Sequence, residues 1–281
     1  MKRALASTAP FGFPETDPVL FLQACHQIGI EAVQFYRNPD DPDRVDVVEA
    51  LAAADRAGVR FHALHGLFGP DLDPSQYNPE MQRHCLAVYE RDGRIALDLG
   101  GPMVIVHPSA NKNHAESTEK SGKTELHEHG ERYSALFEFL QRLADIGERL
   151  GVTYLLENLP GYFPCGHDVR NMAKMIREIG SVRLRMCFDT GHAHMTGDVA
   201  DQLRRCADVV QYLHVHDNDG REDSHLVPGE GTIDWPALAV TIRSADLHAP
   251  LMLELFLTHQ EMQKQVENGL GERLAALLPI N

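Results

Sequence analysis

The sequence has no excess of basic residues. Its 26 Lys and Arg stand against 41 Asp and Glu, which gives a formal net charge of −15. This acidity argues against nucleic acid as a default partner, because phosphate binding relies on clustered Lys and Arg. Nucleic acid stays an alternative, since metal ions could offset the local field of a carboxylate-rich cleft.

The chain also lacks a dense cysteine framework and long apolar runs. The five cysteines (Cys25, Cys85, Cys165, Cys187 and Cys206) include no CxxC pair. In 281 residues this usage indicates reduced, mostly buried thiols. No window approaches the roughly 18 apolar residues that span a membrane, and the N-terminus has no sustained apolar run typical of a signal peptide. We therefore expect a soluble, cytoplasmic protein without a membrane partner.

Segments with strand character alternate with segments of helical periodicity. Strands are expected at residues 4–7, 32–36, 60–65, 103–107, 153–157, 185–189, 212–216 and 251–256. Helices are expected at residues 18–29, 44–58, 79–100, 131–151, 169–180, 199–208, 235–246 and 260–278. This alternation predicts an α/β fold, a single-domain (β/α)8 TIM barrel over residues 1–281. A doubly wound open sheet is the alternative, but no GxGxxG follows the first strand.

Glycine marks the ends of five expected helices. Gly29, Gly58, Gly100, Gly151 and Gly180 each stand between a helix and the next strand. A glycine there commonly adopts the left-handed backbone conformation that ends a helix. The positions of these glycines support the predicted alternation.

Residues 109–130 depart from the compact pattern, because they form a long polar tract after the fourth strand. A loop of this length in a compact domain is usually functional or mobile. His127 and His129 lie in this tract, and we interpret them as solvated side chains rather than ligands.

A His, Asp or Glu stands at the C-terminal end of six successive expected strands. The third, fourth and fifth end in ALHG, VIVHPS and YLLEN, and the sixth reads CFDTGHAH. The seventh reads YLHVH and is followed by a loop containing DSH, and the eighth reads LMLELF. Barrel enzymes place their chemistry at this end of the strands. The residues concerned are His65, His107, Glu157, Asp189, His192, His214, Asp223, His225 and Glu254.

These residue types predict a metal site. One of them alone could be a hydrogen-bonded core histidine, but burying so many ionisable groups is costly unless something neutralises them. The strand ends supply almost no Lys or Arg, so one to three divalent ions are expected rather than a salt-bridge network. Imidazole and carboxylate donors without cysteine favour Mn²⁺, Zn²⁺, Fe²⁺ or Co²⁺ over Ca²⁺. His216 is expected behind the ligands, as an outer partner.

Smaller features complete the predicted site. Gly229 and Gly231 indicate a tight turn that leads to Asp234 as a helix N-cap, with Pro236 in the first helical turn. Four aromatic residues near strand ends are expected to wall the pocket: Phe11, Phe13, Tyr36 and Phe68.

Four motifs carry a resemblance to a known superfamily. The segments LEN (156–158), FDTGH (188–192), HVHDN (214–218) and DSHLVPGEGTIDW (223–235) resemble the xylose-isomerase-like barrels. The similarity covers the chain from about His65 to Glu254. That superfamily contains sugar isomerases and epimerases together with endonuclease IV, so the resemblance implies a TIM-barrel metalloenzyme.

The resemblance to ketose 3-epimerase-like members implies specific roles. Their metal is held by Glu, Asp, His and Glu on the last four strands, which correspond to Glu157, Asp189, His214 and Glu254. The two glutamates would exchange protons on opposite faces of the substrate carbon while the metal stabilises an enediolate, and His192 would contact the substrate oxygens. We therefore expect a sugar (or sugar phosphate) isomerase or epimerase that uses Mn²⁺, Zn²⁺ or Co²⁺ and acts on a small sugar or polyol.

Two other functions stay open. Endonuclease IV-like members bind three zinc ions with nine ligands, and all nine have a matching residue here. However, the loop between His214 and Asp223 is shorter than theirs and lacks their Ser-Lys element, and the FYRNPDDPDR segment is acidic where their DNA-contacting loop is basic. A non-catalytic metal- or sugar-binding barrel is the third candidate. Barrels of this kind often pair, so a homo-oligomer is possible.

Overall fold

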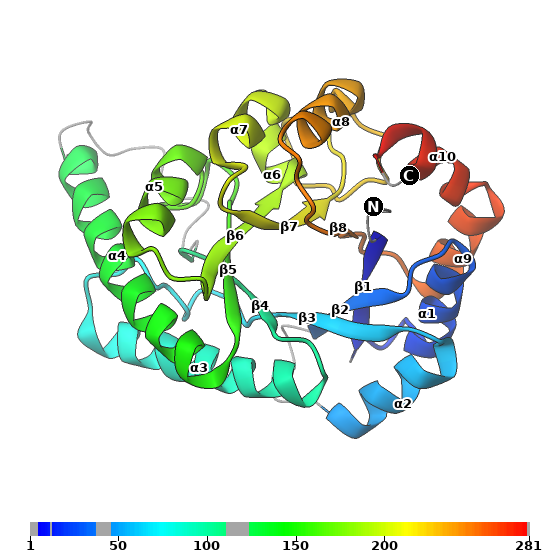
Figure 1. Ribbon diagram of the computed structural model, residues 1–281, viewed down its shortest axis with the longest axis horizontal. Coiled ribbons are helices and arrows are strands. Elements are labelled where there is room, and N and C mark those ends of the chain that lie inside the picture. The colour runs from blue at the N-terminus through cyan, green and yellow to red at the C-terminus, as the bar shows by residue number, and fades with distance from the viewer. Residues whose placement is uncertain (1–4, 12, 38–45, 111–123, 280–281) are drawn as a thin grey trace.

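The computed structural model describes residues 5–11, 13–37, 46–110 and 124–279. Its eight strands form one closed parallel barrel in chain order, in which β1 pairs with both β2 and β8 (Figure 1). The strands are β1 Leu5–Phe11, β2 Ala32–Arg37, β3 Arg60–His65, β4 Met103–Val106, β5 Thr153–Glu157, β6 Leu184–Asp189, β7 Val210–Val215 and β8 Leu251–Leu253. The predicted TIM barrel is confirmed.

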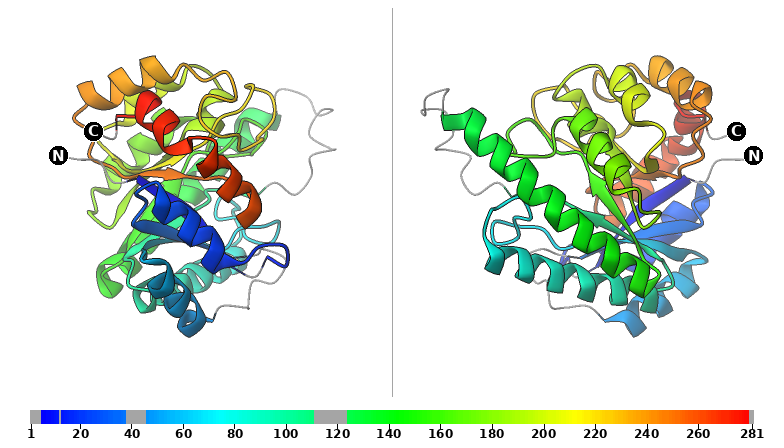
Figure 2. Two further views of the ribbon diagram at one scale, coloured as in Figure 1. Left: turned by 90° about the vertical axis from the view of Figure 1, so that its right-hand side faces the viewer. Right: turned by 60° about the vertical axis from the view of Figure 1, so that its left-hand side comes forward.

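Helices surround the barrel and cover the outer faces of its strands. They are α1 Pro18–Gln27, α2 Val47–Ala57, α3 Pro79–Asp98, α4 Thr124–Leu150, α5 Val169–Ile179, α6 Thr190–His194, α7 Val199–Cys206, α8 Trp235–Ser244, α9 His259–Glu267 and α10 Leu270–Leu277. Figure 2 shows the long helix α4 alongside α3. No helix among the described residues is both long and apolar enough to cross a membrane.

The predicted glycine caps are confirmed. Gly29, Gly58, Gly100, Gly151 and Gly180 all have positive φ, between 68° and 91°. Glycine adopts this conformation without the steric cost that a Cβ would bring. The sequence therefore located the C-terminal ends of α1 to α5 closely.

The helices differ from the prediction in three places, and the strand β8 ends at Leu253 rather than at residue 256. The expected last helix (260–278) is two helices, because Gly269 has a φ of 77° and breaks it between α9 and α10. The short helix α6 was not predicted. The polar tract 109–130 is not a loop throughout, because α4 begins at Thr124. Residues 111–123 of that tract, and the side chains of His127 and His129, lie outside the described part of the chain.

Alternation along the strands builds the interior of the barrel in layers. One apolar layer contains Ala63, Ile105, Leu155, Cys187, Tyr212 and Met252. Side chains two residues further along a strand point the same way, so the next layer lies directly above it. That next layer is the polar one, and it consists of His65, His107, Glu157, Asp189, His214 and Glu254.

Candidate metal centre

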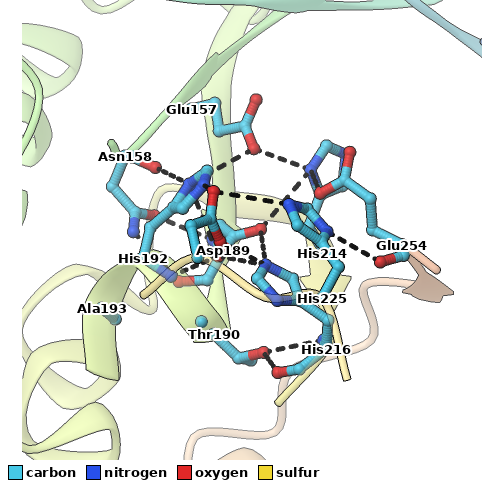
Figure 3. Close-up of polar contacts among 12 residues, drawn as sticks. Glu157, Asn158, Asp189, Thr190, His192, Ala193, His214, His216, His225 and Glu254 are labelled. Carbon is cyan, nitrogen blue, oxygen red and sulfur yellow. Dashed lines mark hydrogen bonds and ion pairs between the residues drawn. The ribbon is translucent and has the colours of Figure 1, made fainter. Parts of the chain in front are cut away.

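The polar layer converges on the centre of the barrel at the C-terminal ends of the strands, as Figure 3 shows for Glu157, Asp189, His214 and Glu254. These four side chains are between 0% and 3% exposed. The Nδ1 atom of His214 lies 2.8 Å from Glu157 Oε1, 3.0 Å from Glu254 Oε2 and 3.8 Å from Asp189 Oδ2. Ligand atoms bound at about 2.1 Å to one divalent ion lie about 3 Å apart, so this first group is spaced like a ligand set.

Glu157 also faces a second group. Its Oε2 atom lies 3.1 Å from His107 Nε2 and 3.6 Å from His65 Nε2. The two imidazole rings lie edge to face, with centroids 5.2 Å apart. One carboxylate therefore joins two groups of potential ligands.

The third group contains His192, Asp223 and His225. Asp223 Oδ2 lies 3.0 Å from His192 Nε2 and 3.4 Å from His225 Nε2. His216 was expected behind the ligands, but it lies among them. Its ring stacks on His225 with centroids 3.9 Å apart, and its Nε2 lies 3.0 Å from both oxygens of Asp189. The structure thus brings all nine predicted residues into three adjoining groups.

The FDTGH motif builds the wall between the groups. Asp189 ends β6 and caps α6, because its Oδ1 accepts the backbone N–H of His192 at 2.6 Å. Thr190 Oγ1 donates to the carbonyl of His216 at 2.8 Å. Gly191 is required because a Cβ at this position would lie 2.0 Å from the His216 ring. Asp189, Thr190 and Gly191 of the motif therefore each have a local structural reason.

The loop from β7 to α8 carries Asp223 and His225. The predicted turn is confirmed: Gly229 has a φ of 90°, and Asp234 accepts the N–H of Ala237 at 2.9 Å as N-cap of α8. His225 is a non-glycine residue with positive φ, 45°. This backbone conformation is uncommon and is often found at functional sites.

Histidines are the charge partners of the site carboxylates. Every ion pair that Glu157, Asp189, Asp223 and Glu254 make within the described part of the chain is with a histidine. Burial opposes ionisation of Glu254, but the charge of His214 outweighs it and lowers the pKa of Glu254 to about 2. Burial likewise opposes protonation of His192, but Asp189 and Asp223 raise the pKa of His192 to about 10.

Three buried polar atoms of the site form no hydrogen bond of normal geometry with the described residues. They are Glu157 Oε2, which has only the ion-pair contacts with His65 and His107, together with Asp223 Oδ1 and His216 Nδ1. Buried polar atoms are nearly always hydrogen-bonded, so a carboxylate oxygen without a hydrogen bond in each of two groups is informative. A divalent cation would satisfy both oxygens, and the imidazole and carboxylate donors suit Mn²⁺, Zn²⁺ or Co²⁺. The residues present therefore fit such an ion.

Aromatic side chains border the site. The ring centroid of Tyr36 lies 6.0 Å from that of Phe13 and 5.1 Å from that of His65. The ring of Phe68 stacks on the ring of His107, with centroids 4.8 Å apart. The predicted wall thus contains three of its four expected members, and the side chain of Phe11 lies outside the described part of the chain. Phe256 was missed although it packs 4.3 Å from His225.

Gln34 on β2 was also missed. It is fully buried, and its side-chain amide lies 3.0 Å from Nε2 of His214. The sequence could have indicated a role for Gln34, because a polar glutamine interrupts the otherwise apolar run AVQFY. Cys187 was expected as a deeper thiol. It lies in the apolar layer below, where burial raises the pKa of Cys187 to about 12, but its Sγ also lies within 4.8 Å of potential ligand atoms of Glu157 and His214.

The model of one protein family, described as the xylose isomerase-like TIM barrel, matches residues 22–277. The chain belongs to this family. Among its relatives, fructoselysine 3-epimerase of Escherichia coli O157:H7 is 25% identical over 151 residues, which are 52% of this chain and 54% of the relative. A probable endonuclease 4 of Oleidesulfovibrio alaskensis is 29% identical over 205 residues, 65% of this chain and 64% of the relative.

The fold is shared with solved structures of the family. A crystal structure of a D-tagatose 3-epimerase-like protein superposes with a TM-score of 0.71 at 20% identity, covering 98% of this chain and 100% of the other. The chain spans about half to two thirds of the length of the curated relatives that it first matches. Its characterised relatives thus include epimerases and a probable endonuclease.

Proposed function

We propose that this chain is a divalent-metal-dependent isomerase or epimerase of a sugar or sugar phosphate. The observation that carries the proposal is the approach of Glu157 and Glu254 to the same nitrogen of His214, at 2.8 and 3.0 Å. The two carboxylates come from β5 and from the residue after β8, which are well separated in the barrel. A small substrate between them would meet a carboxylate on each side.

Four residues would hold the ion: Glu157, Asp189, His214 and Glu254. A divalent cation there would polarise adjacent hydroxyl and carbonyl oxygens and acidify the C–H between them. Histidine partners lower the pKa of both glutamates against the effect of burial, so both are ionised at neutral pH. One carboxylate can then take the proton from carbon. The other must first take a proton from water before it can return one to the opposite face, and loss of the abstracted proton to water restores the starting state.

His192 would bind the oxygens of the substrate. The carbonyl of Asn158 lies 2.8 Å from its Nδ1, and Asp223 lies 3.0 Å from its Nε2, so the ring is held at both nitrogens. With its raised pKa the imidazole is protonated at neutral pH, and a substrate hydroxyl or carbonyl oxygen would take the place of Asp223 as the acceptor of its Nε2–H. The aromatic side chains of Tyr36, Phe68 and Phe256 would exclude water from this space.

The test is proton exchange. The purified protein, loaded with Mn²⁺ or Co²⁺, is incubated in D₂O with a panel of ketoses, and NMR follows loss of the C3 or C2 proton and formation of the epimer or isomer. Glu157→Gln and Glu254→Gln should each abolish exchange, whereas Glu178→Gln, on the exposed face of α5, should leave it unchanged. Turnover that survives in both site variants would contradict the proposed roles.

A second candidate is a multi-zinc phosphodiesterase of the endonuclease IV type. It is favoured by the three adjoining groups, which together contain the nine predicted residues and His216 and could hold up to three ions. In that case His192 would be a metal ligand rather than a substrate-binding residue. Elemental analysis together with an abasic-site duplex assay separates the candidates: two or three zinc ions and duplex nicking favour the endonuclease, and one ion with ketose exchange favours the epimerase.

A further inference from the structure

Three histidines of the site are held in the same way. Each has its Nδ1 atom against a backbone carbonyl oxygen: His65 with Gly66 at 2.9 Å, His192 with Asn158 at 2.8 Å, and His225 with Glu254 at 2.9 Å. A carbonyl oxygen only accepts, so the Nδ1 atom carries the hydrogen. In the neutral ring the Nε2 atom then keeps its lone pair, and in all three histidines Nε2 faces a carboxylate of the site.

His214 is turned the other way. Its Nδ1 atom faces Glu157 and Glu254, and its remote nitrogen, Nε2, lies 3.0 Å from the side-chain amide of Gln34. Gln34 lies on β2 and is fully buried. The nitrogen of His214 that faces away from the glutamates therefore contacts an amide, which can either donate or accept a hydrogen bond. In the other three histidines the corresponding nitrogen contacts a backbone carbonyl, which can only accept.

The amide of Gln34 has one unsatisfied atom. With its nitrogen toward His214, its Oε1 is buried and has no hydrogen-bond partner. In that orientation Nε2 of His214 must accept, so a neutral ring would carry its hydrogen on Nδ1, pointing at the carboxylates that would bind the cation. A rotation of the amide by 180° preserves its shape, places Oε1 against the ring, and makes Nε2 the protonated nitrogen.

We propose that Gln34 is a positioning residue of the metal centre, whose Oε1 accepts the Nε2–H of His214 and so keeps the Nδ1 lone pair directed at Glu157 and Glu254. This inference rests on the proposed function and assigns a role to a residue that the ligand pattern does not contain. In all four histidines, the ring nitrogen that faces away from the carboxylates of the site then donates to an oxygen atom. Such outer partners fix the tautomer of a metal-binding imidazole and raise its basicity.

The first test measures metal affinity, with Co²⁺ alone as probe, in wild type, Gln34→Met and Gln34→Glu. Methionine has a similar length but neither accepts nor donates strongly, so we expect Co²⁺ to bind about 10- to 100-fold more weakly. Glutamate keeps an acceptor oxygen and should retain at least the wild-type affinity. The control is Thr8→Val, because Thr8 is the register partner of Gln34 on β1 and is equally buried, but its hydroxyl donates to the carbonyl of Leu255.

The second test reads the tautomer directly and does not depend on the Gln34 variants folding. Wild-type protein with ¹⁵N-labelled histidine is loaded with Zn²⁺, and long-range ¹H–¹⁵N spectra show which ring nitrogen of each histidine carries a proton. His214, assigned from the signal missing in His214→Gln, should carry its proton on Nε2. His65 and His225 should carry it on Nδ1, and His192, whose two nitrogens both face acceptors, should carry a proton on each.

The outcomes are distinguishable. If wild type binds metal but His214 is protonated on Nδ1, or if Gln34→Met is folded and binds Co²⁺ as tightly as wild type, the role of Gln34 is wrong while the proposed function stands. An equal loss of affinity in Thr8→Val would assign the effect to packing and would also overturn it. If wild type binds no divalent ion at all, both proposals fall together.

Discussion

The indole N–H of Trp235 donates to Asp217 Oδ2 at 2.8 Å, and this bond fastens both ends of the loop between β7 and α8. The same oxygen accepts the N–H of Gly229, and Oδ1 accepts the N–H groups of Asn218 and Ile233. Asp217 is fully buried. One carboxylate thus satisfies four donors of the loop that carries Asp223 and His225.

Asp217→Asn should therefore disorder the third group (His192, Asp223 and His225) more than the first group, which contains His214. An amide in place of the carboxylate would point a donor at backbone N–H groups, which we expect to cost about 3 kcal/mol of folding free energy. Trp235→Phe removes a single bond and should cost about 1 kcal/mol. Urea unfolding measures both. Histidine NMR signals should shift or broaden for His192 and His225 in Asp217→Asn more than for His65 and His214, and unchanged His192 and His225 signals would contradict this prediction.

Gly231 is predicted to be intolerant of any side chain. A Cβ at this position would lie 2.3 Å from both Asn218 O and Asp217 Oδ1, which are held in place by the bonds just described. Gly231→Ala should destabilise the protein by about 2 kcal/mol. The control is Gly130→Ala, because Gly130 lies in α4 with nothing within 4 Å of the added carbon. That change should stabilise the protein by about 0.5 to 1 kcal/mol. Thermal unfolding of both variants measures these changes in stability, and a Gly231→Ala protein as stable as wild type would contradict the prediction.

Glu157 and Glu254 should differ in their effect on metal binding. Glu157 faces two groups through its two oxygens, whereas Glu254 belongs to the first group only. Where a Co²⁺ titration shows ions in both groups, Glu157→Gln should weaken both binding events and Glu254→Gln only one; where it shows a single ion, both variants should bind that ion more weakly. Each loss should exceed the roughly 10- to 100-fold that follows from changing an outer partner. Where ions occupy both groups, identical titration curves for the two variants would show that Glu157 does not bridge.

The stability of the chelator-treated protein should depend on pH through His192. The carboxylates raise the pKa of His192 from an ordinary 6.5 to about 10, despite burial. A raised pKa contributes stability that is fully present below pH 6.5 and disappears as pH rises toward 10. His192→Gln leaves Asp189 and Asp223 without this charge, so it should be less stable than wild type at pH 6.

The measurement is the difference in melting temperature between wild type and His192→Gln, both metal-free, from pH 6 upward. We expect the difference to shrink steadily and to be small near pH 10. A difference that stays constant across this range would mean that His192 stabilises by packing rather than by charge.

The sequence predicted the barrel and the ends of most elements because both depend on local signals. A short apolar run such as YLL in β5 and a glycine after a helix such as α2 are properties of a few consecutive residues. The break at Gly269 and the start of α4 at Thr124 were missed, since a positive φ and the length of a helix in a polar tract are set by packing.

The sequence by itself also determined which side chains enter the polar layer, because the two-residue period of a strand decides which way each one points. The tertiary structure alone decided how they are grouped. The motif HVH could have placed either His214 or His216 between the glutamates, and the pairing of β6 with β7, which shifts between Met186 and Cys187, sets Asp189 level with His214. Contacts across the barrel, such as Gln34 with His214, depend on strand stagger and closure, which no local pattern encodes.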